Sequence, residues 1–293
     1  MQFFIQNLII GIAVGGIYAL IALGFVLIYK STGILNMAQG GLLAIGAFIC
    51  FTLATQGGMP FILATILALL ISFLIGVFVD RTFFRPMIGQ PLIAAIMMTL
   101  ALLFILDGVV ISLWGAQYRK FPQIFPDRPI LLGPFALSHE LFFNFVIAGV
   151  LTAIFILFFR FSRTGTKMRA VACDQQAARA AGINVRRIFT LSWGIGTMIA
   201  TLGGICLGMI TMVFTGLSYS ALKVLPVVIL GGMESIPGAI AGGLIIGVME
   251  SLSGGYIDPY LKGSKEVTPF VVLIIFLVAK PYGLFGLRRI ERI

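Results

Sequence analysis

The chain has 293 residues, of which 60% are hydrophobic and only 10% are charged, and its mean hydropathy is +1.11. Soluble globular domains carry about 25% charged residues, so this composition excludes that class and predicts an all-α protein that crosses a membrane several times. The polar stretches between the apolar runs are too short to bury cores of their own. We therefore expect a single transmembrane domain over residues 1–293.

Apolar runs long enough to cross a membrane follow one another along the chain. A helix of about 20 apolar residues spans the hydrocarbon core, and eight such runs are present: 3–29, 33–56, 59–79, 87–114, 141–159, 188–214, 235–254 and 267–286. The first run has no basic residues before it and exceeds the apolar part of a signal peptide, so we expect a retained helix. The sequence thus predicts about eight full transmembrane helices.

A ninth, shorter run covers residues 217–232. As a helix it would rise only about 24 Å against a core of about 30 Å, and Pro226 removes a backbone donor near its middle. Irregular backbone is tolerated at membrane depth only where protein or a water-filled cavity satisfies it. We therefore predict a broken or re-entrant segment that forms part of the wall of a translocation path.

Two amide side chains, Asn36 and Gln39, lie three residues apart in the second run and are followed by Gly40 and other small residues. Residues three and four positions apart are neighbours on a helix, and small residues let helices approach closely in lipid. Two interpretations remain open. The amides either present donors and acceptors to a passing solute, or they hydrogen-bond a neighbouring helix.

Charged side chains within or beside apolar runs are a second sign of a path through the membrane. Asp107, in the fourth run, either faces the interior of the bundle or lies near the membrane surface. Glu250 is similar but closer to a predicted external loop. Lys223 and Glu234 flank the short run, and we expect them to extend to opposite surfaces. The sequence presents these charges as isolated groups, not as a paired set.

Basic residues concentrate in the stretch 160–187, which holds seven of them against one acid. Such an excess is typical of a cytoplasmic loop. Other basic groups fall on the same side if the spans alternate: Lys30, the turn with Arg81 and Arg85, and the tail over 280–292. The loops around 119–128 and 258–266 mix both charges and are predicted to be external. The amino terminus is then outside and the carboxyl terminus inside, which requires an odd number of crossings.

Within the basic loop, Asp174 is a good N-cap, the residues from Gln175 to Ala181 favour a helix, and Gly182 fits a C-terminal stop. A helix of about two turns is too short to stand alone in water. Two interpretations are open here as well. The helix inserts into a groove of a partner protein, or the loop lies at the interface with its arginines on anionic headgroups.

Motifs for catalysis are absent from the sequence, which contains no GxxxxGK[ST], HExxH or GxSxG. The single histidine, His139, lies in a predicted external loop, and Cys50, Cys173 and Cys206 form no CxxC pair. We expect no metal site, no cofactor bound by this chain and no nucleic-acid partner. A membrane enzyme that acts through His139 or Asp107 is the weakest hypothesis.

Four stretches carry a resemblance to a known family: GGIYALIALGFVLIYKSTGILNMAQGGLLAIGAF (15–48), LWGAQYRKFP (113–122), SRTGTKMRAVACDQQAARAAGINVRRI (162–188) and LGGMESIPGAIAGG (230–243). In this order they resemble the branched-chain amino-acid permeases of bacterial ABC importers, the LivH type. Three residues depart from the family pattern, since Gln39 replaces a histidine, Asp107 an amide and Glu234 a glycine. They leave the substrate open among branched-chain amino acids, urea, short amides and aromatic acids.

The resemblance implies a permease subunit in the inner membrane of a bacterium. Its partners would be a second, LivM-type permease, two ATP-binding subunits and a periplasmic solute-binding protein, with ATP and Mg held by the ATP-binding subunits. The stretch 160–187 would be a coupling loop that contacts the ATPase through Asp174, Gln175, Ala178, Arg179, Ala181 and Gly182. Together with the polar residues described above, this predicts a substrate path along Asn36, Gln39, Gly40, Asp107 and Pro226.

The alternative is a self-contained secondary transporter or channel for a small polar solute. Such a protein needs its own coupling-ion site or continuous pore, which isolated acids do not supply. It would transport alone in liposomes, whereas an importer subunit needs ATP-binding partners.

Overall fold

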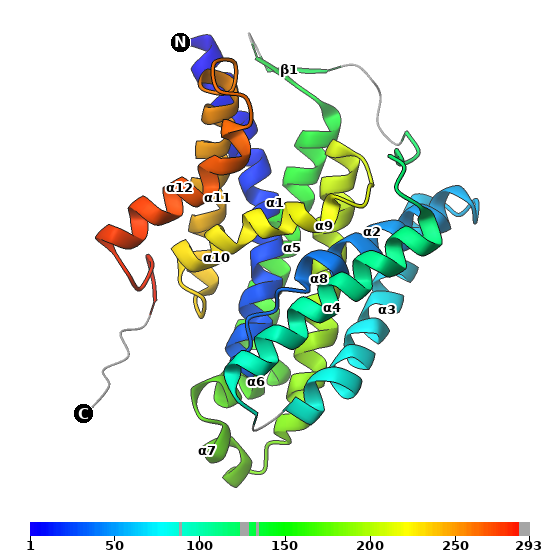
Figure 1. The fold of residues 1–293 in the computed structure, drawn as a ribbon, viewed down its shortest axis with the longest axis vertical. Coiled ribbons are helices and arrows are strands. Elements are labelled where there is room, and N and C mark those ends of the chain that lie inside the picture. Colours follow the sequence, from blue (N-terminus) through cyan, green and yellow to red (C-terminus); the bar gives the residue numbers. More distant parts are fainter. Residues whose placement is uncertain (88–89, 124–128, 133–134, 287–293) are drawn as a thin grey trace.

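The computed structural model of the chain describes residues 1–87, 90–123, 129–132 and 135–286 (Figure 1). Its elements, in chain order, are α1 (Gln2–Thr32), α2 (Gln39–Thr55), α3 (Phe61–Val79), η1 (Asp80–Phe84), η2 (Arg85–Met87), α4 (Leu92–Trp114), β1 (Ile130–Leu132), β2 (Phe135–Leu137), α5 (His139–Phe161), α6 (Arg163–Cys173), α7 (Gln175–Ala180), α8 (Val185–Thr211), α9 (Leu217–Ser220), η3 (Ala221–Lys223), α10 (Val224–Gly231), α11 (Ile236–Tyr256) and α12 (Ser264–Ala279). The expected helical membrane class is confirmed. Arg128 and the part of the basic tail after residue 286 lie outside the described residues.

Six helices of the described part are long and apolar enough to cross a membrane, namely α1, α3 with its extension to Met87, α4, α5, α8 and α11. The other two expected spans form shorter helices, α2 with 17 residues and α12 with 16. The second span starts late because Gly33, with a φ of 74°, ends α1 in the left-handed conformation. The last ends early because Pro281 disfavours helical geometry at the residue before it.

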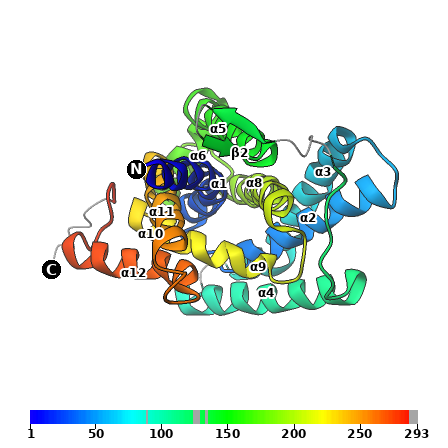
Figure 2. The same cartoon turned by 90° about the horizontal axis from the view of Figure 1, so that it is seen from above.

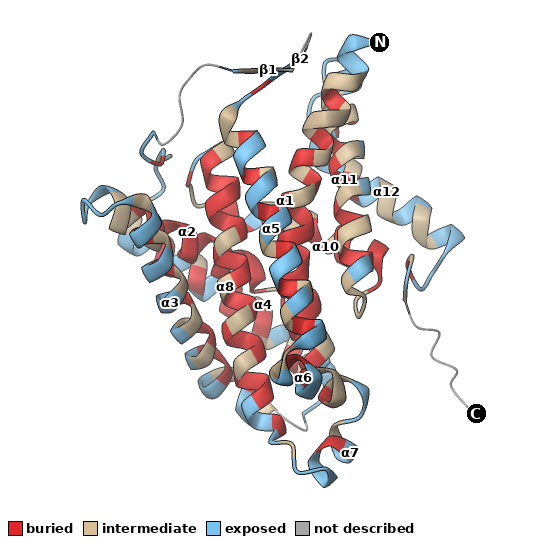
Figure 3. Cartoon of the chain, turned by 180° about the vertical axis from the view of Figure 1, so that it is seen from behind, coloured by how far each residue is buried: buried red, intermediate tan, exposed pale blue. Residues whose placement is uncertain are grey.

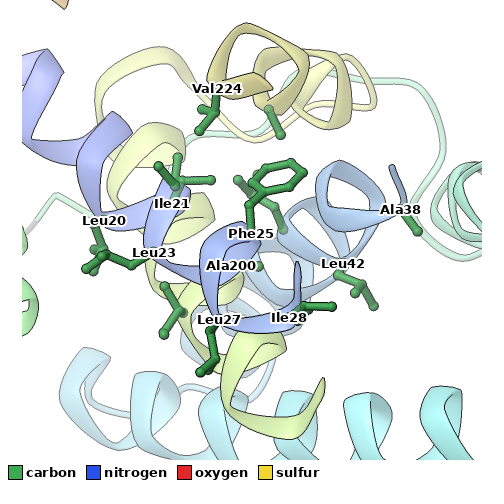
Figure 4. Close-up of a cluster of buried hydrophobic side chains, with 14 of the residues drawn as sticks. Leu20, Ile21, Leu23, Phe25, Leu27, Ile28, Ala38, Leu42, Ala200 and Val224 are labelled. Atoms are coloured by element: carbon green, nitrogen blue, oxygen red, sulfur yellow. The ribbon is translucent and has the colours of Figure 1, made fainter. Parts of the chain in front are cut away.

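The centre of the bundle is α1, which α5, α8 and α11 surround (Figure 2). Apolar side chains of α1, such as Ile21 and Phe25, meet Leu42 of α2, Ala200 of α8 and Val224 of α10 (Figure 4). By contrast, α3, α4 and α5 carry exposed apolar faces (Figure 3). In a chain of this class such faces are available to lipid or to a partner subunit, because they would be costly in water.

A glycine seam joins α1 to α11, formed by Gly11 and Gly15 on one helix and Gly243 and Gly247 on the other. A Cβ atom added at Gly15 would lie 2.7 Å from the carbonyl oxygen of Gly243, closer than real Cβ contacts allow. Without side chains at these positions the two backbones approach closely, as small residues permit in membrane helices. The antiparallel packing of α11 along α1 follows from this seam.

A small hairpin was not predicted. Strands β1 and β2 pair antiparallel in the connection between α4 and α5. Each strand has only three residues, so no alternation of apolar and polar side chains is long enough to indicate a strand.

Candidate functional site

The short run between α8 and α11 is a helix interrupted by a 3-10 turn. α9, η3 and α10 follow one another without a gap and run across the bundle rather than along it (Figure 1). Pro226 is buried as the third residue of α10, a first-turn position whose N–H has no partner within an ideal helix. The break lies in η3, just ahead of the proline. The role of Pro226 in a path stays a prediction.

The two amides of the second run are buried and hydrogen-bonded. Asn36 Nδ2 donates to Gln39 Oε1 at 2.9 Å, and Asn36 Oδ1 accepts from the backbone N–H of Ala38 at 3.1 Å. Gln39 Nε2 donates to the carbonyl oxygen of Gly196 in α8 at 3.2 Å. The amides therefore hold the turn into α2 and fasten it to α8. Of the two interpretations, the bond to a neighbouring helix is present, and contact with a solute stays a prediction.

Gly40 and Asp107 meet at a residue that the sequence did not point to, Ser218 in α9. A Cβ atom at Gly40 would collide with the Ser218 carbonyl oxygen, so α2 packs directly on α9. Asp107, half-buried on α4, interacts with the Ser218 side chain. Asp107 thus faces the bundle, which was one of its two expected positions. A lone serine within an apolar run gives no signal from which this contact is predictable.

Lys223 does not extend to a surface as expected, which corrects that prediction. Its ammonium lies 3.1 Å from Glu250 Oε1 and 2.5 Å from Glu266 Oε2. The side chain of Glu250 is only 3% exposed, that of Lys223 14%, and that of Glu266 64%. The ammonium ends in ion pairs with one buried and one exposed carboxylate, which leaves little of the lysine side chain in contact with water. Glu250 and Lys223 therefore form a paired charge set between the helices, where the sequence presented isolated groups.

Sequence reasoning missed this pair because its members are 27 residues apart on separate elements. No helical spacing connects them. The available signal was chemical: opposite charges in consecutive apolar segments generally pair with each other.

A cavity of about 380 Å³ adjoins the ion pairs, between α1, α8, α9 and α11 and the start of α12. Its walls are mainly apolar, with Ile10 and Val14 from α1 and Leu207 from α8, and its polar end carries two ammoniums and two carboxylates, those of Lys223, Lys265, Glu250 and Glu266. Its volume lies within the roughly 300–1,000 Å³ of small-molecule sites, which combine apolar walls with a few convergent polar groups. The cavity can accept a small solute that is both charged and apolar.

The predicted helix of the basic loop is confirmed as α7. Asp174 Oδ1 accepts from the backbone N–H groups of Gln176 at 2.7 Å and Ala177 at 3.0 Å, and Gly182 follows with a φ of 78°. Both caps are therefore in place. The helix has six residues, slightly fewer than the two turns expected.

Among the predicted coupling residues, only Ala178 is buried, at 4% exposure, and it anchors α7 to the rest of the loop. Gln175 lines a cavity of about 250 Å³ that also reaches Asp80 and Trp193 in the bundle. Arg179, Ala181 and Gly182 are exposed. The loop thus presents one polar surface outward while its other face contacts the membrane helices.

The loop is held rigidly at its root. Ser162 caps α6 by accepting from the backbone N–H of Gly165 at 2.8 Å, and Arg169 donates to the carbonyl oxygens of Phe159 and Arg160. Near the end of α5, where its ammonium lies 5.7 Å from the Phe159 ring centroid, Lys30 Nζ donates to the backbone carbonyl of Glu234 at 3.0 Å. Motion of the loop would therefore be transmitted to α5 and α1.

These features define a class: a helical membrane protein of several spans, with a charged cavity between its helices and a capped polar loop at one end. Over residues 7–279 the chain matches the family described as branched-chain amino acid transport system / permease component. The chain belongs to this family.

Individual relatives agree with this assignment. The chain is 28% identical over 311 residues to the high-affinity branched-chain amino acid transport system permease protein LivH of Escherichia coli, covering 99% of this chain and 98% of that protein. It is 30% identical over 308 residues to the corresponding permease BraD of Pseudomonas aeruginosa, with the same coverage. Among solved structures, PsaBC from Streptococcus pneumoniae in complex with Fab superposes with a TM-score of 0.48 at 17% identity, over 94% of this chain and 90% of that chain.

Proposed function

We propose that this chain is the permease subunit of an ATP-driven importer for branched-chain amino acids or related small polar organic solutes. The observation that carries the proposal is the full-length similarity to LivH and BraD, since 99% of the chain is covered in each comparison. The cavity beside Lys223 and the outward polar surface of α7 support it independently, because an importer subunit needs both a solute path and a contact with its ATPase.

The assembly that we propose contains a second, LivM-type permease, two ATP-binding subunits that hold ATP and Mg, and a periplasmic solute-binding protein. Residues 160–187 form the coupling loop within the single domain, and its contacts with the ATPase involve Asp174, Gln175, Ala178, Arg179, Ala181 and Gly182. Hydrolysis would bias the two permeases between inward-open and outward-open states by differential binding.

Within the membrane, we propose that the path passes the meeting point of α2, α4 and α9, lined or braced by Asn36, Gln39, Gly40, Asp107 and Pro226. We also propose that α2 and α12 cross together with the six long helices, which makes eight crossings. Because eight crossings place both termini on one side, the opposite sides expected from the basic residues require the broken segment α9 to α10 to be a ninth, partial crossing.

The secondary-transporter alternative gains one observation, since Lys223 and Glu250 are paired rather than isolated. A paired intramembrane charge set is a feature of such transporters. Membership in a family of permease components of transport systems favours the importer nevertheless.

The test is purification of the tagged chain from its native membrane in mild detergent, with mass spectrometry of the proteins that accompany it. We expect a second permease and a Walker-containing ATPase in stoichiometric amounts. Because Arg179 and Gln176 are exposed on α7, the double variant Gln176→Glu/Arg179→Glu should lose the ATPase and keep the second permease. Ala178 is left unchanged because it is buried.

The matched control is Arg81→Glu, which reverses an exposed arginine at the same end of the molecule but outside the loop. This control should retain the ATPase. A chain that purifies alone and transports a solute in liposomes would establish the secondary-transporter alternative. Normal ATPase retention by the double variant would reject α7 as the coupling element.

A further inference from the structure

The exposed apolar face of α3 ends in two arginines. Along this face Leu70, Leu74 and Phe78 are exposed at intervals of four residues (Figure 3). Arg81 and Arg85 follow at intervals of three and four residues, and both are exposed as well. Side chains at these spacings share one face of a helix. The surface of α3 therefore changes from apolar to positively charged along a single line.

The start of α8 adds a second pair of arginines beside the first. Arg186 and Arg187 are exposed in its first turn. One hydroxyl group joins the two helices at this level, because the Arg85 guanidinium donates to Thr190 Oγ1 at 3.2 Å and this oxygen donates to Asp80 Oδ2 at 2.6 Å. Arg186 lies one turn before Thr190 and so shares its face of α8. The turns that meet at this junction of α3 and α8 thus carry four arginines.

The chain itself does not neutralise the positive charge of the junction. Asp80 interacts electrostatically with Arg81 and Arg85, and it is buried, at 2% exposure. In the described part of the chain, none of the four arginines forms an ion pair with a carboxylate within 4.0 Å. One carboxylate against four guanidinium groups leaves three positive charges in excess. An anion bound here would reduce the repulsion between them.

We propose that the junction of α3 and α8 binds the headgroup of an anionic phospholipid, whose acyl chains lie along the exposed apolar face of α3. Guanidinium groups bind phosphate oxygens through parallel hydrogen bonds, and basic pockets between membrane helices bind anionic headgroups. The order of the surface, apolar and then cationic, matches the order of acyl chain and phosphate in a lipid. An acidic protein surface would match the arginines but not the apolar face that leads to them.

The hydrogen bond from Arg85 to Thr190 prepares the site for its lipid. It holds one guanidinium group in place before the phosphate arrives, which lowers the entropy lost on binding. The cavity that reaches Asp80 is also lined by Gln175 of α7, so the junction lies at the same end of the molecule as the basic loop. The site goes beyond the proposed function, because the chain presents it to lipid whatever solute it carries.

The experiment measures lipid binding to the purified chain, together with the subunits that accompany it, by native mass spectrometry in detergent. The probes are phosphatidylglycerol, which is anionic, and phosphatidylethanolamine with the same acyl chains, which is zwitterionic. We expect phosphatidylglycerol to bind about tenfold more tightly or better. Glycerol 1-phosphate, which has the phosphate without acyl chains, should not displace it. These comparisons use the wild-type protein and do not depend on the folding of a variant.

Two double variants test the two pairs of arginines. Arg81→Gln/Arg85→Gln and Arg186→Gln/Arg187→Gln should each weaken the binding of phosphatidylglycerol by about tenfold or more, because each removes two of the four charges. All four side chains are exposed, so the substitutions leave the packing between α3 and α8 in place.

The matched control is Lys167→Gln/Arg179→Gln, which removes two exposed positive charges from α6 and α7 and should bind phosphatidylglycerol like the wild type. The inference is overturned if phosphatidylethanolamine binds as tightly as phosphatidylglycerol, if either arginine variant binds it like the wild type, if the control weakens binding equally, or if glycerol 1-phosphate displaces the lipid. Loss of a copurifying ATPase from Arg81→Gln/Arg85→Gln would assign the junction to that protein instead of a lipid.

Discussion

A single lysine shows how burial decides the conformation of a long side chain. Lys223 was expected to extend to the membrane surface, yet it lies 86% covered between two carboxylates, since its side chain is 14% exposed. Removing a charge from water is expensive, and the free energy is recovered only when the partner charges are close and well placed. Lys223 and Glu250 must therefore be considered as a unit.

Lys223→Met tests this dependence. The substitution leaves Glu250 buried without its cation, and loss of one member of a buried pair costs about 3–5 kcal/mol. We expect a marked fall in the thermal unfolding temperature of the purified permease. The double variant Lys223→Met/Glu250→Gln should recover much of that loss, because no uncompensated charge remains inside. Equal unfolding temperatures of the single and double variants would contradict the pairing.

At the scale of elements, the glycine seam makes the strictest demand on side-chain volume. Gly15→Ala places a methyl group against the Gly243 backbone, where neither helix is able to yield without moving apart. Overpacking of this kind costs about 1–3 kcal/mol. We expect a lower unfolding temperature and weaker packing of α11 on α1, measured by thermal unfolding of the purified protein in detergent.

A matched control for this prediction is Gly149→Ala in α5. A Cβ atom there meets nothing within 4 Å, and alanine favours the helix over glycine by roughly 0.5–1 kcal/mol. The control should be neutral or slightly stabilised. If Gly15→Ala and Gly149→Ala lower the unfolding temperature equally, the prediction that Gly15 is needed for the close packing of α1 on α11 is wrong.

Elements set by local signals were predictable from the sequence, and those set by tertiary contacts were not. Within the described residues, each of the nine apolar segments contains a helix, and the caps at Asp174 and Gly182 follow from the residues themselves. The predicted start of the second span was too early, because apolar composition does not reveal that Gly33 ends α1 and that Asn36 holds the turn before α2. Ser218 and the partner of Lys223 were missed because each depends on how α9 and α10 cross the bundle.

For the whole molecule, the distribution of basic residues predicts the orientation in the membrane. A native cysteine can report this orientation by chemical labelling, since Cys173 is exposed at the end of α6 whereas Cys50 and Cys206 are buried. A membrane-impermeant maleimide should not label Cys173 in intact spheroplasts and should label it in inside-out vesicles washed free of peripheral subunits. Cys173→Ser should abolish the signal. Labelling of Cys173 in intact spheroplasts would show that the orientation is the opposite of the predicted one.

The position of Lys223 also has a consequence for biosynthesis. Lys223 is synthesised 27 residues before Glu250, and Glu266 follows later still. During translation Lys223 is therefore made before either of the carboxylates that pair with it. A segment as short as α9 to α10 has little apolar surface to offset that charge, so its stable insertion has to wait for α11. Chains truncated before Glu250 should consequently hold this segment outside the bilayer, and the last two helices complete the insertion of the element that precedes them.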